Sequence, residues 1–305
     1  MRVLIVASYN AGKFSSFITE QVEAIRQLGV EVDYFGIVGK GIIGYLRNLP
    51  ALRRKIKQFK PEIVHAHFGL SGLFANLQRK VPVVTTYHGC DINVRKLRIL
   101  SLASILLSRY NIFVSKSLAK KVRNWSLKKA MILTCGVNLD LFVPKDKYEC
   151  RKIMNLPLDK KIVLFSSSFS RPEKNSQLAF SVVEKLDNVQ LVELNGYSRE
   201  EVVLMMNAAD VGLLTSFRES APLFLKEMTA CHRPVVSTPV GDVSEILDAI
   251  EGSFISAFDE KEMAKKVSKA MTYDHIIPPD TWALRYDNKI ISKKLVSLYL
   301  QLIPK

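Results

Sequence analysis

Short, continuous apolar runs alternate along this chain with segments of helical periodicity. In the first half, the runs expected to form strands lie at 3–7, 30–37, 63–67, 81–87, 112–115 and 131–133. Segments with apolar residues every three or four positions separate them, at 16–28, 50–59, 72–79, 97–108 and 117–124. Strands without an alternating polar face are typical of parallel sheets covered by helices on both faces. The pattern therefore predicts a doubly wound α/β domain.

The same alternation begins again near residue 160. Further strands are expected at 162–167, 189–194, 211–214 and 234–237, and helices at 177–186, 200–208, 223–231, 244–249 and 260–271. A link near 144–158 joins the two series, and helical spacing returns from 281 to 302. The sequence thus predicts two Rossmann-like domains, residues 1–145 and 146–280, followed by a closing helical segment at 281–305. Sheets of this type bind ligands beyond the carboxyl ends of their strands.

Positive charge is concentrated in the first half of the chain. Residues 1–150 hold 24 Lys and Arg against 9 Asp and Glu, whereas the remaining residues hold 20 of each. An asymmetric basic field favours an anionic partner, such as phospholipid head groups, a lipid-diphosphate acceptor, a polyanionic glycan or nucleic acid. General solubility is the alternative, but it does not require the asymmetry. No nucleic-acid recognition module accompanies the charge, so nucleic acid is not expected.

Two regions carry most of these cations. The helix expected at 50–59 has an apolar stripe for packing on a sheet, and its cations are Arg53, Arg54, Lys55, Lys57 and Lys60. The second region contains Lys116, Lys120, Lys121, Arg123, Lys128 and Lys129. We expect one or both regions to contact anionic lipid or a phosphorylated acceptor.

Cysteine spacing and apolar run lengths bear on the cellular compartment. The four cysteines are scattered and form no C-x-x-C pair, which indicates a reducing compartment. The uncharged run at 99–108 is about half of what a spanning helix needs. The first apolar run is too short for the core of a signal peptide. A cytoplasmic protein is expected, with peripheral contact to the inner membrane face as an open alternative.

Chemistry is indicated most strongly by the segment 215–227, which follows a buried apolar run and leads into a helix. Ser220 is expected to cap that helix by accepting a backbone N–H bond. The helix start then offers free N–H groups and a positive dipole end, which suit a phosphate. Glu219 lies in the turn, and Glu227, two helical turns further on, could accept both hydroxyls of a ribose. One short element could thus hold a sugar, a diphosphate and a ribose, as in a nucleotide-sugar.

The segment 215–227 and the following 230–245 together resemble the paired-glutamate signature of retaining glycosyltransferases of the GT-B fold, glycosyltransferase family 4. The resemblance implies two Rossmann-like domains facing a cleft, with acceptor bound by 1–145 and donor by 146–280. It also implies that the closing helix, with Trp282, packs back toward the first domain. The implied donor-binding residues of the signature are Glu219, Ser220, Ala221, Leu223 and Glu227. His232 stands where the family has a small residue, and is interpreted as a helix C-cap.

A basic loop follows the first strand of the second series. Its residues Arg171 and Lys174 resemble the family loop in which an Arg and a Lys neutralise the donor diphosphate. Fixed cations there would stabilise the charge that builds on the leaving diphosphate. The family Arg normally stands earlier in the loop, where this chain has Ser168 and Phe169, so Arg171 is interpreted as its replacement. The alternative is a solvated charged turn.

The first domain supplies three further candidates. Residues 85–91 resemble the family's His-Gly-x-Asp loop, which implies that His88 faces the donor sugar and that Asp91 lies near acceptor or sugar hydroxyls. A packed, hydrogen-bonded histidine is the alternative for His88. Gly12, in the turn after the first strand, would let the backbone approach the donor closely. With the signature and the basic loop, this gives His88, Glu219 and Lys174 as the candidate catalytic residues.

Two other patterns are not interpreted as cofactor or metal sites. The glycines of 39–44 fit G-x-G-x-x-G, but they follow the second strand rather than the first, so a nicotinamide cofactor is rejected. They are expected to form a flexible loop in which Gly41 borders the acceptor site. His65 and His67 share one side of a strand, yet no ligand-type carboxylates accompany them, and no metal is expected. The lack of a D-x-D motif argues against the metal-dependent GT-A enzymes.

These inferences combine into one expected function. The chain is predicted to be a retaining, metal-independent glycosyltransferase that needs no cofactor beyond its nucleotide-diphosphate sugar donor. The acceptor would be a glycan or a lipid-linked glycan, in polysaccharide or glycolipid biosynthesis. Two alternatives stay open: a sugar-nucleotide epimerase on the same fold, and a non-catalytic protein that binds polyanions or membranes.

Overall fold

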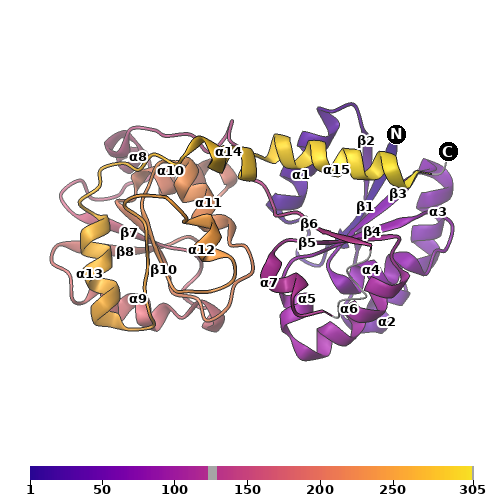
Figure 1. Cartoon of the computed structure of the whole chain (residues 1–305), viewed down its shortest axis with the longest axis horizontal. Helices are drawn as coiled ribbons and strands as arrows, with labels where there is room; N and C mark the ends of the chain where they lie inside the picture. Colours follow the sequence, from indigo (N-terminus) through magenta and orange to yellow (C-terminus); the bar gives the residue numbers. More distant parts are fainter. Residues whose placement is uncertain (123–128, 304–305) are drawn as a thin grey trace. The chain divides into compact units, whose positions relative to one another are not determined.

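The computed structural model of the chain describes residues 1–122 and 129–303. It divides into two compact units, residues 1–136 together with 288–305, and residues 137–287 (Figure 1). We call them the first and the second unit. Each contains one parallel sheet with helices on both faces.

The first unit is built on a sheet of order β2-β1-β3-β4-β5-β6, in which all described pairs are parallel. Its strands are β1 (Arg2–Ser8), β2 (Glu31–Ile37), β3 (Ile63–His67), β4 (Val83–Tyr87), β5 (Tyr110–Phe113) and β6 (Ala130–Ile132). Its helices are α1 (Ser16–Arg26), α2 (Gly41–Leu46), α3 (Leu49–Phe59), α4 (Gly69–Asn76), α5 (Cys90–Asn93), α6 (Arg95–Leu107), α7 (Lys116–Ala119) and α15 (Asn288–Leu302).

Two apolar cores lie on opposite faces of this sheet. Because successive strand side chains point to opposite faces, alternate residues of β1 enter different cores. Val3 and Ile5 pack with α1 and α15, whereas Leu4 and Val6 pack with α3 and α4. The continuous apolar strands of the sequence are thereby explained, since neither face of the sheet is left to water.

The second unit is built on a parallel sheet of order β11-β10-β9-β7-β8. Its strands are β7 (Lys161–Phe165), β8 (Val189–Glu193), β9 (Val211–Leu214), β10 (Val235–Ser237) and β11 (Phe254–Ile255). Its helices are α8 (Lys147–Ile153), the 3-10 turn η2 (Pro172–Lys174), α9 (Ser176–Val183), α10 (Arg199–Ala208), α11 (Leu223–Ala230), α12 (Val243–Ile246), α13 (Glu260–Ala270) and α14 (Asp280–Tyr286).

The unit boundaries differ from those expected at 145 and 280. Val137 and Phe142 are buried in the core of the second unit, which moves the first boundary to residue 136. Trp282 and Tyr286 of α14 belong to the same core, so the chain leaves the second unit only at residue 287. The helix that packs in the first unit is α15, which lies against α1.

Two local expectations were wrong. The expected link at 144–158 contains helix α8, whose first turn is capped by the carboxylate of Asp146 accepting from the N–H of Glu149. The expected flexible loop at 39–44 contains most of α2, which begins at Gly41. Gly39 and Gly44 stand so close that a Cβ on Gly44 would lie 2.8 Å from the Gly39 carbonyl carbon. The glycines therefore allow a tight backbone contact rather than a loose loop.

Candidate functional site

Three loops meet at the carboxyl ends of β7, β9 and β10 in the second unit. The Lys174 ammonium, in the loop after β7, lies 2.6 Å from the Glu219 carboxylate in the loop after β9. Both side chains are largely buried, and the hydroxyl of Ser216 donates a second bond of 2.8 Å to Glu219. The Thr215 hydroxyl donates to the carbonyls of Lys174 and Asn175, which holds the two loops together. The structure thus brings two predicted site residues into direct contact.

The loop after β10 supports the signature loop from behind. The N–H of Asp242 donates to the Ser220 carbonyl at 2.8 Å. Gly241 has a positive φ of 57°, and a Cβ there would lie 2.4 Å from the same carbonyl oxygen. Only glycine fits this backbone without displacing the Glu219–Ser220 segment.

Glu227 is buried on α11 and forms an ion pair that the sequence had not indicated. Its Oε1 lies 2.5 Å from Nη2 of Arg199, the first residue of α10. The Arg199 guanidinium also lies over the Phe142 ring, 4.5 Å from its centroid. Arg199 directly follows Ser198, which caps α10 in a capping box with Glu201. That cap fixes where α10 begins. The sequence signal for a cation at this place was a basic residue, Arg199, directly after a serine that caps a helix.

The start of α11 differs from the expectation for Ser220. The helix begins at Leu223, its N-cap residue is Pro222, and no side chain caps it. Proline ahead of the first turn ends the preceding extended segment and leaves no N–H to satisfy. The N–H groups of Ala221 and Leu223 find no acceptor within the described part of the chain. Polar donors are therefore present at this helix start, as the sequence predicted, although the cap is different.

Arg171 lies apart from the Lys174–Glu219 pair. Its guanidinium donates two bonds to the Glu173 carboxylate, at 2.8 and 2.5 Å, and its side chain is 55% exposed. Lys174 thus contacts Glu219 of the paired-glutamate segment, whereas Arg171 contacts Glu173 in the same loop. His232 was interpreted as the helix C-cap, but the C-cap residue of α11 is Cys231. His232 follows it with a φ of 57°, the left-handed conformation common one residue past a helix end.

In the first unit, His88 follows β4 and stacks among aromatic rings. Its ring lies 4.6 Å from the rings of Phe17 and Phe68, and its Nε2 is hydrogen-bonded to Nδ1 of His67 at 3.0 Å. The Sγ of Cys135 lies 3.7 Å from its Nδ1. Burial lowers the pKa of His88 well below the usual histidine value, so the ring is neutral. A neutral imidazole carries a proton on one ring nitrogen and can accept a hydrogen bond or a proton at the other.

Asp91, expected near acceptor or sugar hydroxyls, has a buried side chain that is bonded to the backbone around it. Its carboxylate accepts from the N–H groups of His88, Gly89 and Gly69 at 3.2, 2.8 and 3.2 Å. Burial raises the pKa of its carboxyl, while these N–H bonds oppose the shift. The main effect of Asp91 is to fix the backbone that carries His88.

The remaining sequence candidates lie on the surface of the first unit. Gly12 (φ 71°) and Gly41 (φ 65°) are exposed, and a Cβ would meet nothing at either position. On α3, Leu52 and Ile56 are buried and the cations surround them, with Lys55 paired to Asp33. Of the second basic region, Arg123 and Lys128 lie outside the described residues.

Neither a metal cluster nor a spanning helix is found in the part of the chain that the structure describes. No group of three or more His, Cys, Asp or Glu residues there could hold a metal ion. His65 bonds to Thr86 and Tyr299 instead, and His67 to His88. Among the described helices, none has the length and apolar character needed to cross a membrane.

Comparison with known proteins identifies the family. The chain matches Glycosyltransferase Family 4 over residues 15–141 and Glycosyl transferases group 1 over residues 160–272. It belongs to this glycosyltransferase family, which confirms the resemblance carried by the paired glutamates. Sucrose-phosphate synthase from Thermosynechococcus elongatus superimposes with a TM-score of 0.83 over 99% of both chains, at 16% identity. The predicted GT-B fold class of two parallel-sheet α/β domains is thereby confirmed.

Curated relatives match over part of their length. The D-inositol 3-phosphate glycosyltransferase of Mycolicibacterium smegmatis is 24% identical over 259 residues, 69% of this chain and 59% of that protein. The N,N'-diacetylbacillosaminyl-diphospho-undecaprenol alpha-1,3-N-acetylgalactosaminyltransferase of Campylobacter jejuni is 27% identical over 228 residues, 63% of this chain and 60% of that protein. The match thus spans about three fifths of each relative.

Proposed function

We propose that this protein transfers a sugar, with retention of anomeric configuration, from a nucleotide-diphosphate sugar to a glycan or lipid-linked acceptor. The observation that carries the proposal is the pair of ion contacts on the signature element, Lys174 with Glu219 and Arg199 with Glu227. Cations and carboxylates alternate there beside a helix start that has unused N–H donors. A nucleotide-sugar presents the complementary groups, namely an anionic diphosphate and neutral hydroxyls.

Each group has a defined task in this proposal. Glu227 accepts the ribose hydroxyls, and Glu219 accepts a hydroxyl of the donor sugar. Lys174 and the N–H groups of Ala221 and Leu223 contact the diphosphate, where charge grows as the bond from sugar to phosphate breaks. Arg199 adds a fixed cation near the ribose through its pair with Glu227. The sequence had instead given the second cation to Arg171, at the diphosphate.

The acceptor is proposed to bind the first unit. His88, held by His67 and by the Asp91-ordered backbone, is the candidate group near the reacting hydroxyl, and Gly41 is a candidate at the rim of the acceptor site. Gly12 stays a candidate for close backbone approach to the donor. No protein nucleophile is assigned, so the leaving phosphate takes the acceptor proton as the new bond forms. No metal and no cofactor are required. The name of the Campylobacter relative specifies a diphospho-undecaprenol acceptor, and this supports a lipid-linked acceptor here.

The test is a thermal-shift panel of nucleotide-diphosphate sugars against wild type and Glu227→Ala. A matched control is Glu260→Ala, which removes a carboxylate from an exposed ion pair with Lys185 in the same unit. Stabilisation by one nucleotide-sugar that is lost in Glu227→Ala and kept in Glu260→Ala would support the donor site. Product analysis by NMR of the anomeric proton then tests retention.

The alternatives predict other results. A non-catalytic polyanion-binding protein would show no stabilisation by any nucleotide-sugar and no hydrolysis of one. A sugar-nucleotide epimerase would be stabilised but would convert the donor into its epimer without an acceptor. The contact between Lys174 and Glu219 favours transfer, because it aligns a diphosphate cation with a sugar-side carboxylate.

A further inference from the structure

Helix α6 directs small polar residues inward and large apolar residues outward. Ser101 and Ser104 are fully buried against α4, where a Cβ on Gly69 or Gly72 would collide with their hydroxyls. On the outer side, Ile99, Leu106 and Leu107 are 65%, 62% and 56% exposed. A helix of a water-exposed surface normally shows the opposite arrangement. Packing against α4 therefore does not account for the outer face of α6.

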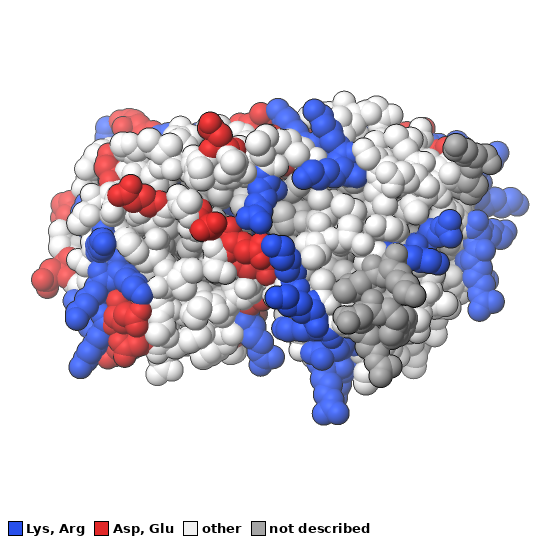
Figure 2. Space-filling view, viewed as in Figure 1, with Lys and Arg blue, Asp and Glu red and all other residues white. Residues whose placement is uncertain are grey.

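Cations without nearby carboxylates surround this face. Between residues 63 and 139 the chain has twelve Lys and Arg and a single acidic residue, Asp91, which is buried. Arg95 and Lys96 are exposed at the start of α6, and Arg109 follows its end. The first unit as a whole holds 26 Lys and Arg against 6 Asp and Glu, and the second holds 18 against 23. Figure 2 shows Asp and Glu mainly on the second unit, and few on the first.

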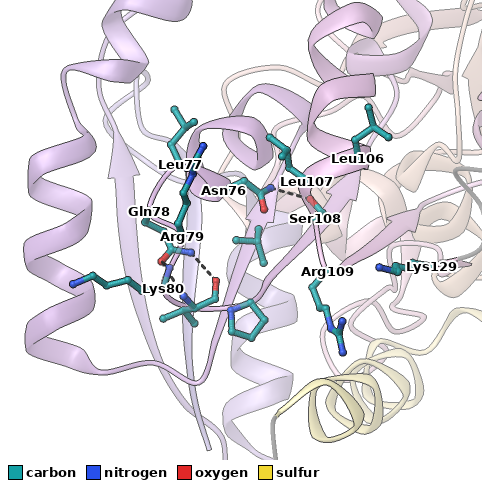
Figure 3. Close-up of a pocket in the computed structure, with 13 residues that line it drawn as sticks. Asn76, Leu77, Gln78, Arg79, Lys80, Leu106, Leu107, Ser108, Arg109 and Lys129 are labelled. Carbon is teal, nitrogen blue, oxygen red and sulfur yellow. Dashed lines mark hydrogen bonds between the residues drawn. The ribbon is translucent and has the colours of Figure 1, made fainter.

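A pocket of about 470 Å³ lies at the carboxyl end of α6 (Figure 3). Leu106 and Leu107 form one part of its lining, and the loop between α4 and β4 forms another. Its four cations are Arg79, Lys80, Arg109 and Lys129. Within the described part of the chain, none of these four has a carboxylate partner.

The loop that carries two of these cations is rigidly built. Gln78 is buried, and its Oε1 accepts from the N–H groups of Lys80 and Val81 at 2.7 and 2.9 Å. Its Nε2 donates to the Val81 carbonyl at 2.6 Å. Arg79 has a positive φ of 58°, which the Gln78 bonds help to hold. The cations are therefore presented from an ordered backbone.

A purely structural explanation covers part of this pattern. Cations near the carboxyl ends of α4 and α6 complement the helix dipoles, and this would explain one or two of them. It does not explain the outward leucines and isoleucine, nor the lack of paired carboxylates. The arrangement of an apolar strip between cationic ends is that of a helix lying in a membrane interface.

We propose that α6 and this pocket dock on an anionic phospholipid surface. The side chains of Ile99, Leu106 and Leu107 enter the boundary between head groups and acyl chains. Lipid phosphates are bound by Arg79, Lys80, Arg109 and Lys129 at one end and by Arg95 and Lys96 at the other. Docking of this kind does not depend on the proposed transfer reaction.

This surface differs from the one expected from the sequence alone. The apolar residues of α3, Leu52 and Ile56, are buried in the sheet core, so α3 offers charge without an inserting face. Arg53 donates to the Leu77 carbonyl at 3.2 Å, which places the cations of α3 beside the pocket loop. We assign them the weaker role of long-range attraction.

The test is flotation of the full chain with vesicles of phosphatidylcholine, with and without phosphatidylglycerol. Binding is expected only with phosphatidylglycerol and should weaken as salt is raised. Arg79→Gln/Lys80→Gln/Arg109→Gln is expected to lower partitioning by about a hundredfold, and Arg54→Gln/Lys57→Gln by less. Ile99→Ser/Leu106→Ser should lower it by about tenfold or more.

The controls separate docking from other uses of this face. Ile277→Ser/Leu284→Ser removes equally exposed apolar groups from the second unit and should leave binding unchanged. Thermal melting checks that every variant folds. Equal vesicle binding by wild type and the α6 variant would overturn the proposal. Displacement of the protein from vesicles by soluble glycerol phosphate would also overturn it, because that result indicates a phosphate site only. So would a wild-type dimer that is lost in Ile99→Ser/Leu106→Ser, because that result indicates a second copy of the chain on this face.

Discussion

The hydroxyl of Tyr299, near the end of α15, lies 2.5 Å from Nδ1 of His65 in β3, and both side chains are fully buried. The other ring nitrogen of His65 is bonded to the Thr86 hydroxyl at 2.7 Å. Burial raises the pKa of Tyr299 well above the usual tyrosine value, so its hydroxyl keeps its proton. The tautomer of His65 decides which group donates in this hydrogen bond. This contact fixes the position of the last helix on the first sheet.

Replacing Tyr299 by phenylalanine should destabilise the first unit. The change removes the hydroxyl and leaves Nδ1 of His65 buried without a partner, which costs about 1–3 kcal/mol. Denaturant unfolding measures the loss, and Tyr148→Phe is the control because Tyr148 is exposed. Equal stability of the two variants would contradict the role given to this hydrogen bond.

The buried histidines should make the first unit sensitive to acid. Burial lowers the pKa of His67 to about 3, whereas an unfolded histidine titrates near about 6.5. The folded state thus keeps His67 neutral while the unfolded chain gains a proton. The contribution of neutral His67 to the free energy of unfolding is therefore fully present above about pH 6.5. It is lost as the pH falls from there toward 3, by about 1.4 kcal/mol per pH unit.

The check is urea unfolding at pH 7 and pH 5 for wild type, His67→Gln and the exposed control His275→Gln. Between pH 7 and pH 5, His67→Gln should lose about 1–2 kcal/mol less unfolding free energy than wild type, whereas His275→Gln should lose as much as wild type. An unchanged slope in that variant would exclude His67 as its source. His65 and His88, whose pKa values burial also lowers, should account for the slope that remains.

Gly241→Ala should cost more stability than Gly12→Ala. Both residues have a positive φ, which costs an alanine about 1–2 kcal/mol. At Gly241 the new methyl group also meets the Ser220 carbonyl, whereas at Gly12 it meets nothing. The difference in melting temperature between the two variants measures the collision alone. Equal losses would show that the signature loop can move away freely.

The buried carboxylate of Asp210 should be essential for the second unit. It forms ion pairs with the buried guanidinium of Arg151 and with Lys147, and accepts the Ile162 N–H at 2.7 Å. Asp210→Asn leaves Arg151 with an uncompensated buried charge, which should cost about 3–5 kcal/mol. The exposed pair Lys266–Glu262 supplies the control, since Glu262→Gln removes a solvent-screened carboxylate and should cost far less. Denaturant unfolding compares them.

Arg199 and Arg171 should differ in donor binding. Arg199→Gln removes the cation paired with Glu227, and we expect affinity for the nucleotide-sugar to fall by about 10–100-fold, as for a lost charge-assisted hydrogen bond. Arg171→Gln alters an exposed turn and should change affinity little. Isothermal titration with the donor found by thermal shift measures the donor affinity of both variants. A larger loss in Arg171→Gln would restore the assignment made from the sequence.

The apolar pattern was sufficient for the fold class and for most elements. Strands β3 and β9 have the expected bounds, because runs such as 211–214 are apolar throughout and buried on both faces of the sheet. Helix α8 was missed because its polar sequence lacks a clear apolar face, and tertiary packing of Cys150 and Arg151 holds it. Short helices such as α2 and α5 give too few turns for a periodic signal.

The local motif with its spacing predicted that Glu219, Glu227 and Lys174 follow neighbouring strands and share one site, and the structure brings Lys174 into contact with Glu219. Only the tertiary structure decided the partners. The Arg199–Glu227 pair joins two helices, and the burial of Asp91 depends on backbone from two separate loops. The outward face of α6 is likewise invisible in sequence, because which side of a helix meets the core depends on what packs against it. Sequence fixes residue types and their local order, whereas contact between distant segments arises only when the chain is folded.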